Sequence, residues 1–292
     1  MRTYFECIPC FIRQVLDAVR MTSDDQQVQL QVLRKALRLA SEADLTQSPP
    51  AMAQQIHRYI RELTADPDPY IEVKDKFNKI ALQMYPDLRT RIEKSIDPLE
   101  TAVRLAIAGN INDFGVTSNI EESHVPKTVA ESLEAPLDLN ALDDFRKAVT
   151  KAKNILYLGD NAGEIVFDRL LVEQLPYQKI AFVVKNGPVI NDATIDDALI
   201  TGMTDVVEVI DNGSDAPGTI LDSCSEQFRD RFDNTELIIA KGQGNYETLS
   251  DVDKDVFFLL RAKCPVAARH IGCEIGDMVL SRNTIKTGAK KP

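Results

Sequence analysis

The stretch 154–164, NILYLGDNAGE, constrains the fold of this chain more than any other. Residues 155–158 are apolar throughout, which is typical of a strand buried on both faces of a sheet. The tight polar turn 159–163 follows, and an amphipathic helix begins at Glu164, where a carboxylate complements the helix dipole. A buried strand, a tight turn and a helix in this order are typical of parallel α/β sheets. In such sheets ligands bind at the carboxyl ends of the strands.

The rest of the chain supports an α/β fold. After residue 153, apolar strand patterns alternate with helical patterns, which predicts a mostly parallel sheet covered by helices on both faces. Four further strands are predicted at residues 179–185, 205–210, 236–240 and 256–260. Between residue 24 and about residue 148 nearly every segment has the apolar spacing of an amphipathic helix. We therefore predict an all-α N-terminal domain, residues 1–148, followed by a three-layer α/β/α domain with a Rossmann-like sheet, residues 149–292.

Charge and apolar patterning restrict the partners that this chain can have. The net charge is −11, and basic residues do not cluster before the tail at residues 286–291, so we expect no nucleic-acid partner. No apolar run approaches the ~20 residues of a membrane span, and the first residues lack a signal-peptide core. We expect a cytoplasmic protein that does not bind membranes. The sequence leaves the oligomeric state open, a homo-oligomer included.

Cys7 and Cys10 form a CxxC motif at the start of the first predicted helix, with Pro9 in its first turn. A CxxC at a helix start can lower a thiol pKa or supply half of a metal site. A zinc site would need a second pair of ligands, and the sequence contains no further CxxC or HxxxH. A structural role is therefore favoured for Cys7 and Cys10, and a redox or metal role is the alternative.

Polar side chains follow the predicted strands at the points where the strands end. Asp160 and Asn161 follow the first strand, Asp192 lies beyond the turn after the second, and Lys241 and Asn245 follow the fourth. The carboxyl ends of parallel strands meet at one edge of a sheet, so we expect these side chains to lie close together. The simpler interpretation is that such turns favour polar residues in any protein.

Asp160, Asn161 and Asp192 together offer two carboxylates and an amide oxygen. Such an all-oxygen set suits hard divalent cations such as Mg²⁺ or Mn²⁺ better than zinc. Three protein ligands also leave coordination positions for water and a substrate oxygen, as metal-assisted catalysis requires. We therefore predict a divalent-metal site at this edge of the sheet.

The residues after the fourth predicted strand suit a phosphate group. Lys241 would supply a point charge, the backbone at Gly242 and Gly244 can approach an anion closely, and Asn245 can orient it. Together with the metal site, these residues predict phosphoryl transfer to water, with Asp160 and Lys241 as the catalytic residues. The sequence leaves open whether water or a carboxylate attacks phosphorus.

Two other classes of function remain open. One is a dinucleotide- or adenosylmethionine-binding module, although the turn GDNAG is not G-x-G-x-x-G and no Walker A lysine pattern occurs. The other is a non-catalytic metabolite-binding protein, in which Asp160 and Asn161 would form an ordinary Asx turn. Dependence of a hydrolytic activity on divalent metal separates these classes.

Three ordered segments resemble the signatures of a known family. They are 158–164 (LGDNAGE), 184–194 (VKNGPVINDAT) and 240–246 (AKGQGNY), and they look like those of the DUF89 family of metal-dependent damage-control phosphatases. That family includes relatives known as acidic-residue methyltransferase 1. Residues 7–10 (CIPC) and 109–113 (GNIND) resemble its mainly prokaryotic, CxxC-bearing subfamily.

The resemblance implies a helical domain packed on an α/β/α domain, with the site between them. It implies a metal held by Asp160, Asn161 and Asp192, and a lysine, Lys241, that faces the phosphate. Its implied substrates are small phosphorylated metabolites, sugar phosphates among them, and its implied cofactor is Mg²⁺, Mn²⁺ or another divalent transition metal such as Co²⁺ or Ni²⁺. Carboxyl methylation with adenosylmethionine is the alternative activity.

Asn110 and Asp113 follow an apolar helix that ends at Gly109, a residue suited to a helix C-terminus. Polar groups next to a buried helix need partners, so these two residues form either a capping turn or the polar wall of a pocket. The family resemblance favours the pocket and implies that Asn110 and Asp113 contact the substrate.

Overall fold

The computed structural model describes residues 1–109 and 124–283. Within them, six strands form one sheet in the order β3-β2-β1-β4-β5-β6, in which β6 alone is antiparallel to its neighbour. The predicted α/β class with a mostly parallel sheet is confirmed. The strands are β1 (Ile155–Leu158), β2 (Ile180–Val184), β3 (Glu208–Asp211), β4 (Leu237–Lys241), β5 (Val256–Arg261) and β6 (Met278–Asn283).

Strand β6 is not among the strands predicted from the sequence, because its apolar pattern is too short to recognise. Only Val279 and Leu280 of β6 are buried, whereas β1 and β4 are buried along their whole length. The strand forms at the edge of the sheet by antiparallel pairing with β5, in which Leu280 lies opposite Leu259. Its assignment depends on this long-range pairing rather than on local periodicity.

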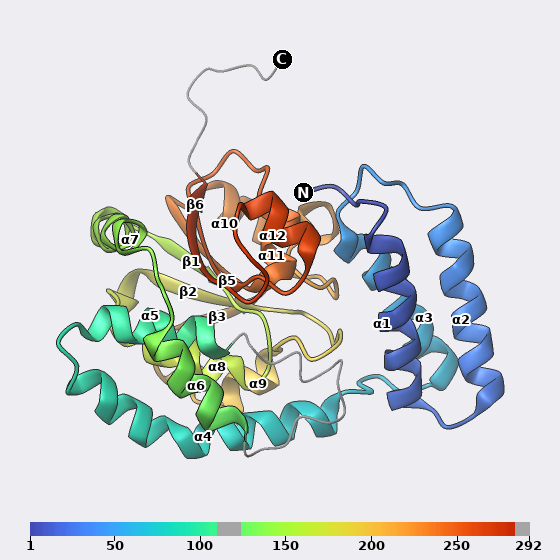
Figure 1. Cartoon of the computed structure of the whole chain (residues 1–292), viewed down its shortest axis with the longest axis horizontal. Coiled ribbons are helices and arrows are strands. Elements are labelled where there is room, and N and C mark those ends of the chain that lie inside the picture. The colour runs from blue at the N-terminus through green and yellow to red at the C-terminus, as the bar shows by residue number, and fades with distance from the viewer. Residues whose placement is uncertain (110–123, 284–292) are drawn as a thin grey trace.

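Helices surround the sheet on both faces (Figure 1). On one face, apolar residues of α4, α5, α7 and α8 pack on the strands; on the other, residues of α10 and α11 do so. The helices are α1 (Cys7–Thr22), α2 (Gln26–Ser41), α3 (Pro49–Thr64), α4 (Ile71–Glu93), α5 (Pro98–Gly109), α6 (His124–Glu134), α7 (Leu139–Lys151), α8 (Glu164–Val172), α9 (Ile195–Ile200), α10 (Glu226–Asp233), α11 (Gly242–Leu249) and α12 (Pro265–Ile271), with 3₁₀ turns at η1 (Tyr177–Lys179), η2 (Met203–Asp205) and η3 (Leu221–Ser223).

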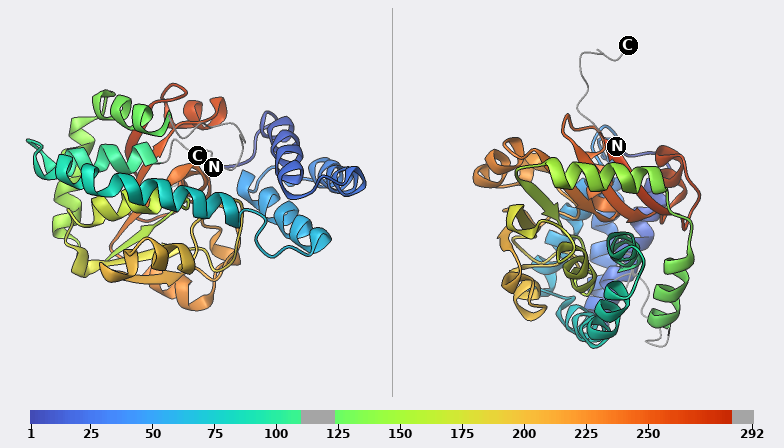
Figure 2. Two further views of the ribbon diagram at one scale, coloured as in Figure 1. Left: turned by 90° about the horizontal axis from the view of Figure 1, so that it is seen from below. Right: turned by 90° about the vertical axis from the view of Figure 1, so that its left-hand side faces the viewer.

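The N-terminal helices belong to two different hydrophobic cores. Helices α1–α3 pack around their own cluster, which includes Val19 and Ile56. Helices α4, α5 and α7 share a core with the sheet, where Phe145 of α7 contacts Phe257 of β5 with ring centroids 5.2 Å apart. Figure 2 shows α1–α3 as a group set apart from the rest of the chain. The predicted domain boundary after residue 148 stays a prediction; the packing itself separates α1–α3, here called the α1–α3 lobe.

The strand order places β1 and β4 side by side at the centre of the sheet. From this pair the chain proceeds outward on one side to β2 and β3, and on the other to β5 and β6. Ile155 pairs with Leu237 and Leu158 with Ala240, so the two strands end at the same level. In doubly wound sheets, the crevice at such a reversal of strand order is where ligands bind.

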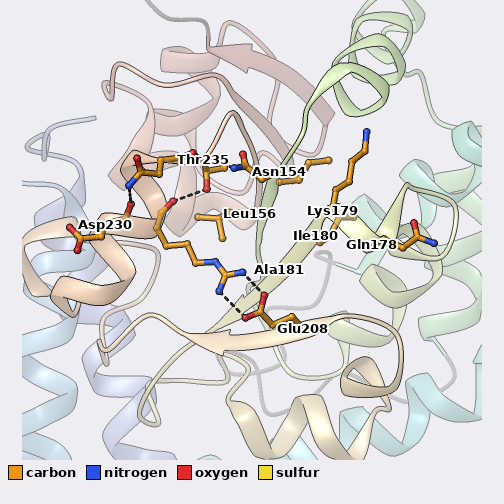
Figure 3. Close-up of a pocket in the computed structure, with 12 residues that line it drawn as sticks. Asn154, Leu156, Gln178, Lys179, Ile180, Ala181, Glu208, Asp230 and Thr235 are labelled. Atoms are coloured by element: carbon orange, nitrogen blue, oxygen red, sulfur yellow. Dashed lines mark hydrogen bonds and ion pairs between the residues drawn. The ribbon is translucent and has the colours of Figure 1, made fainter.

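A cavity of about 370 Å³ lies at the opposite edge of the sheet, beside the amino-terminal ends of β1, β2 and β3 (Figure 3). Asn154, Lys179 and Glu208 line it, and Arg231 of α10 donates to the Glu208 carboxylate there.

None of the described helices combines the length and the apolar character that crossing a membrane requires.

Candidate functional site

Backbone hydrogen bonds bring the turn after β1 and the loop after β2 together. The Ala193 N–H donates to the Asp160 carbonyl at 2.8 Å, and the Ala162 N–H donates to the Asn191 carbonyl at 2.8 Å. Asn161 and Asp192 thereby form an isolated antiparallel bridge. Residues 29 and 33 positions apart are therefore held next to each other by main-chain contacts, which do not depend on side-chain rotamers.

The side chains of the three predicted metal ligands present oxygen atoms at this point. Asp192 is 4% exposed, and its Oδ2 has no hydrogen-bond partner among the described residues. The Asn161 amide nitrogen donates to Asp160 Oδ2 at 2.9 Å and to Glu164 Oε2 at 2.9 Å. With its nitrogen used in this way, the amide can offer only its oxygen to a ligand.

The electrostatics of the two acids favour a bound cation. Burial raises the pKa of Asp160 to about 6, and repulsion from Glu164 adds to this effect while Lys263 and Lys185 oppose it. Burial raises the pKa of Asp192 to about 8, with Lys185 opposing and Asp160 adding to the shift. Two buried acids, one with an oxygen that lacks a hydrogen bond, gain stability from a nearby positive charge.

The donor set therefore fits a hard divalent cation. Two carboxylates and one amide oxygen are the ligand types that Mg²⁺ and Mn²⁺ prefer. No group of three or more His, Cys, Asp or Glu side chains suited to a metal occurs at residues 1–109 or 124–283. The predicted set is of another kind, because it combines the carboxylates of Asp160 and Asp192 with the amide of Asn161. Asn110 and Asp113, the predicted pocket residues, lie outside the described residues.

Lys241 is wholly buried at the end of β4, where its ammonium group has three acceptors. Its Nζ donates to the Ala106 carbonyl at 2.8 Å, to Glu164 Oε1 at 2.5 Å and to Asp168 Oδ1 at 2.7 Å. An ammonium group has three N–H donors, so a direct contact with phosphate requires one of these bonds to open. The predicted contact between Lys241 and a phosphate oxygen stays a prediction.

Glu164 does more than the sequence analysis indicates. It begins α8, as predicted, but its carboxylate is 2% exposed and accepts hydrogen bonds from both Asn161 and Lys241. The chain Lys241–Glu164–Asn161 fixes which end of the Asn161 amide faces the site. Helix periodicity could not reveal this role, because Lys241 is 77 residues away in the sequence.

Gly242 and Gly244 allow Asp160 and Gly218 to lie close to the backbone of α11. Gly242 has φ +78°, and a Cβ there would lie 3.0 Å from Asp160 Cβ and nearer still to the carboxylate. A Cβ on Gly244 would lie 3.0 Å from the Gly218 nitrogen. The side chain of Asn245 donates to the Gly159 carbonyl at 3.2 Å and the Lys241 carbonyl at 2.8 Å. Asn245 thus ties α11 to β1, and its predicted contact with phosphate stays a prediction.

Two backbone N–H groups at the start of α8 already have hydrogen-bond partners within the protein. The Gly163 N–H donates to Asn78 Oδ1 of α4 at 2.7 Å, and the Ala162 N–H is bonded to Asn191. Asn78 also donates to Asp197 Oδ1 at 2.8 Å, so α4 holds the turn after β1 in place. The role of Asn78 cannot be read from the sequence, because a single amide within an amphipathic helix gives no local signal.

The α1–α3 lobe contacts the same edge of the sheet. Arg58 and Arg61 of α3 form ion pairs with Asp215, which follows β3, at 2.5 Å each. Arg61 also donates to the Pro188 carbonyl, in the loop after β2, at 2.6 Å. In that loop Ile190 has φ +46°, a rare conformation for a β-branched residue. The lobe thus contacts the segment that carries Asp192.

Cys7 and Cys10 lie in the first turn of α1, and all five cysteines are free thiols. Desolvation raises the pKa of both thiols, and the neighbouring Cys264 and Glu247 raise it further. A raised pKa disfavours the thiolate, which is the reactive form. The redox or structural role of this pair stays a prediction.

The fold and the polar edge define a Rossmann-like α/β protein with an oxygen-rich site where its strand order reverses. Comparison with known proteins agrees with this class. Residues 3–279 match the family described as "Damage-control phosphatase ARMT1-like domain". The chain therefore belongs to this family, and the DUF89 resemblance seen in its motifs is confirmed.

Two curated relatives carry the name of the family. A damage-control phosphatase of Archaeoglobus fulgidus is 36% identical over 279 residues, which cover 94% of this chain and 96% of the relative. Damage-control phosphatase PH1575 of Pyrococcus horikoshii is 33% identical over 291 residues, covering 98% of this chain and all of the relative. The crystal structure of PH1575, described as a DUF89 family protein, superposes with a TM-score of 0.87, over 97% of this chain and 100% of that one.

Proposed function

We propose that this chain is a metal-dependent phosphatase that hydrolyses small phosphorylated metabolites of the phosphomonoester class, sugar phosphates among them. One structural observation carries the proposal. Asp192 Oδ2, buried and without a hydrogen bond from the described residues, lies in the loop bonded to the turn of Asp160 and Asn161. Membership of a damage-control phosphatase family supports the same reaction.

Asp160, Asn161 and Asp192 would hold the metal in this proposal. A bound divalent cation supplies charge for a phosphoryl oxygen and neutralises the charge that develops there. Glu164 and Lys241 would act on the site through Asn161, because Glu164 accepts from the amide nitrogen and from Lys241, which leaves the amide oxygen for a cation. Such supporting contacts keep ligands in a productive orientation. The candidate metals are Mg²⁺, Mn²⁺, Co²⁺ and Ni²⁺.

Gly242 lets Asp160 approach the start of α11. Because Gly242 has no side chain, the Asp160 carboxylate lies against its backbone, in space that a Cβ would occupy. Catalysis by such a site depends on positioning and on charge neutralisation rather than on a strong protein nucleophile.

A hydrolysis screen tests the proposal. The purified protein, freed of metal with a chelator, is assayed with a panel of sugar phosphates and other phosphomonoesters after addition of each of the four metals. We expect phosphate release that requires added metal and that Asp160→Asn abolishes. Release that is equal in the presence of chelator, or equal in Asp160→Asn, would contradict the proposal, and so would the absence of release from every ester.

A further inference from the structure

Three lysines are buried in the part of the chain that the structure describes, and they differ in how many acidic side chains contact their ammonium groups. Lys74 donates to Asp68 at 3.1 Å and pairs with Asp197 at 3.0 Å. Lys241 has three acceptors, two of them carboxylates. Both charges are therefore matched or exceeded by acidic partners inside the protein.

Lys185, at the end of β2, is different. It is 2% exposed, and its Nζ donates to a single acceptor within the described residues, the carbonyl oxygen of Gly218. Its other close contact is electrostatic: Nζ lies 3.5 Å from Asp192 Oδ2, the atom that lacks a hydrogen bond. Two of the three N–H donors of Lys185 thus lack a hydrogen-bonded acceptor among those residues.

The position of Lys185 is fixed from both ends. Its backbone N–H donates to the Ala193 carbonyl at 2.9 Å, next to Asp192, and it forms a parallel bridge with Thr194. At the other end, Gly218 packs so closely on Gly244 that a side chain there would overlap its carbonyl. A buried ammonium group held in this way costs little further entropy when it meets a ligand.

The charges around Asp192 indicate what Lys185 would contact. In the proposed loaded site, a divalent cation cancels the charges of Asp160 and Asp192. The charge of Lys185 is then left without an acidic partner of its own. A phosphoryl group is the anion that the site would admit, and an ammonium group contacts phosphate as a point charge. Lys263, which follows β5, also lowers the pKa of Asp160 and adds to the positive field.

We propose that Lys185 is the buried lysine that contacts the phosphoryl group, whereas Lys241 is a positioning residue behind Asn161. This assignment rests on the proposed phosphatase function, which it deepens by naming the anion-binding cation. Lys185 lies in the motif VKNGPVINDAT, but the motif alone does not show which lysine has N–H donors without acceptors.

Binding measurements with two probes test the assignment without turnover. Mn²⁺ affinity of the metal-free protein and inorganic phosphate affinity of the Mn²⁺-saturated protein are measured by calorimetry. We expect Lys185→Met to weaken phosphate binding about tenfold or more, as for loss of one charge-assisted hydrogen bond. Its Mn²⁺ affinity should be unchanged or higher, because a cation near Asp192 has been removed. A purely structural defect would weaken both.

Lys179→Met is the matched control, since Lys179 lies at the other end of β2 and contacts the Thr150 and Ala152 carbonyls. It should bind both probes as the unmodified protein does. If Lys185→Met unfolds at a lower temperature than the unmodified protein, Lys185→Gln, which keeps a donor near Gly218, is measured in its place. Phosphate affinity within twofold of the unmodified protein in both variants would overturn the assignment, as would no phosphate binding by the unmodified protein.

Hydrolysis separates this inference from the proposed function. If phosphate binding depends on Lys185 but the unmodified protein hydrolyses no ester, the assignment stands and the phosphatase proposal fails. If the protein hydrolyses esters and Lys185→Met and Lys185→Gln do so with unchanged KM and phosphate affinity, the phosphatase proposal stands and the assignment fails.

Discussion

Replacing Gly242 with alanine tests the geometry of the site most directly. Gly242 has φ +78°, where a side chain costs about 1–2 kcal/mol. The added Cβ would also lie 3.0 Å from Asp160 Cβ and would overlap the carboxylate itself. Ordinary contact between such atoms needs 3.4–4 Å, so the Asp160 carboxylate must move by roughly 1 Å or more.

A displacement of roughly 1 Å in a catalytic group can lower the rate about a hundredfold. We therefore expect Gly242→Ala to lose about a hundredfold in kcat/KM, which corresponds to about 2.7 kcal/mol. Mn²⁺ affinity should fall as well, because Asp160 is a proposed ligand. Both are measured with a small phosphomonoester and by calorimetry, and thermal unfolding reports the stability of each variant.

Gly272→Ala is the matched control for this prediction. Gly272 caps α12 with φ +90°, and a Cβ there would meet no atom within 4 Å. It therefore imposes a similar backbone cost without touching the site. If Gly242→Ala retained the metal affinity and kcat/KM of Gly272→Ala, the proposed approach of Asp160 to the α11 backbone would be refuted.

Three further predictions follow from named contacts. Asp192→Ala should abolish both Mn²⁺ binding and hydrolysis, and activity retained with Mn²⁺ would remove Asp192 from the site. Lys241→Met should lower the free energy of unfolding by about 3–5 kcal/mol, because it leaves Glu164 and Asp168 buried without their cation. An unchanged melting temperature together with lost phosphate affinity would instead favour direct contact between Lys241 and phosphate. Burial would raise the pKa of Asp215, but hydrogen bonds from Arg58, Gln54 and Arg61 outweigh burial and hold it at about 2. The resulting stability, about 2 kcal/mol, is present above the unfolded pKa near 4 and is lost as pH falls through about 2. At pH 7, Asp215→Asn should therefore have a lower free energy of unfolding than the unmodified protein, and this difference should shrink between pH 4 and pH 2. A difference in the free energy of unfolding by urea that stays constant over this pH range would contradict the prediction.

The elements that could be read from the sequence are those with a strong local pattern. The strand at residues 155–158 is apolar throughout, and the structure buries it on both faces. The third strand is predicted three residues early, since β3 begins at Glu208. Its residues are only partly buried, so their apolar pattern marks the start poorly. The α1–α3 lobe has the same helical periodicity as α4–α7, and only packing separates the two groups.

The ends of the predicted strands indicate which residues lie at the carboxyl edge of the sheet. A parallel sheet must bring the ends of its strands to one edge, so Asp160, Asp192 and Lys241 could be placed there from their positions after predicted strands. The contacts of the two buried lysines at this edge, Lys185 and Lys241, depend on the tertiary structure. Lys241 meets Glu164 and Asp168, whereas Lys185 meets one carbonyl and the acid at the proposed metal site. Hydrogen-bond partners distant in the sequence leave no local pattern, so only the folded chain shows which buried charges have acidic partners inside the protein.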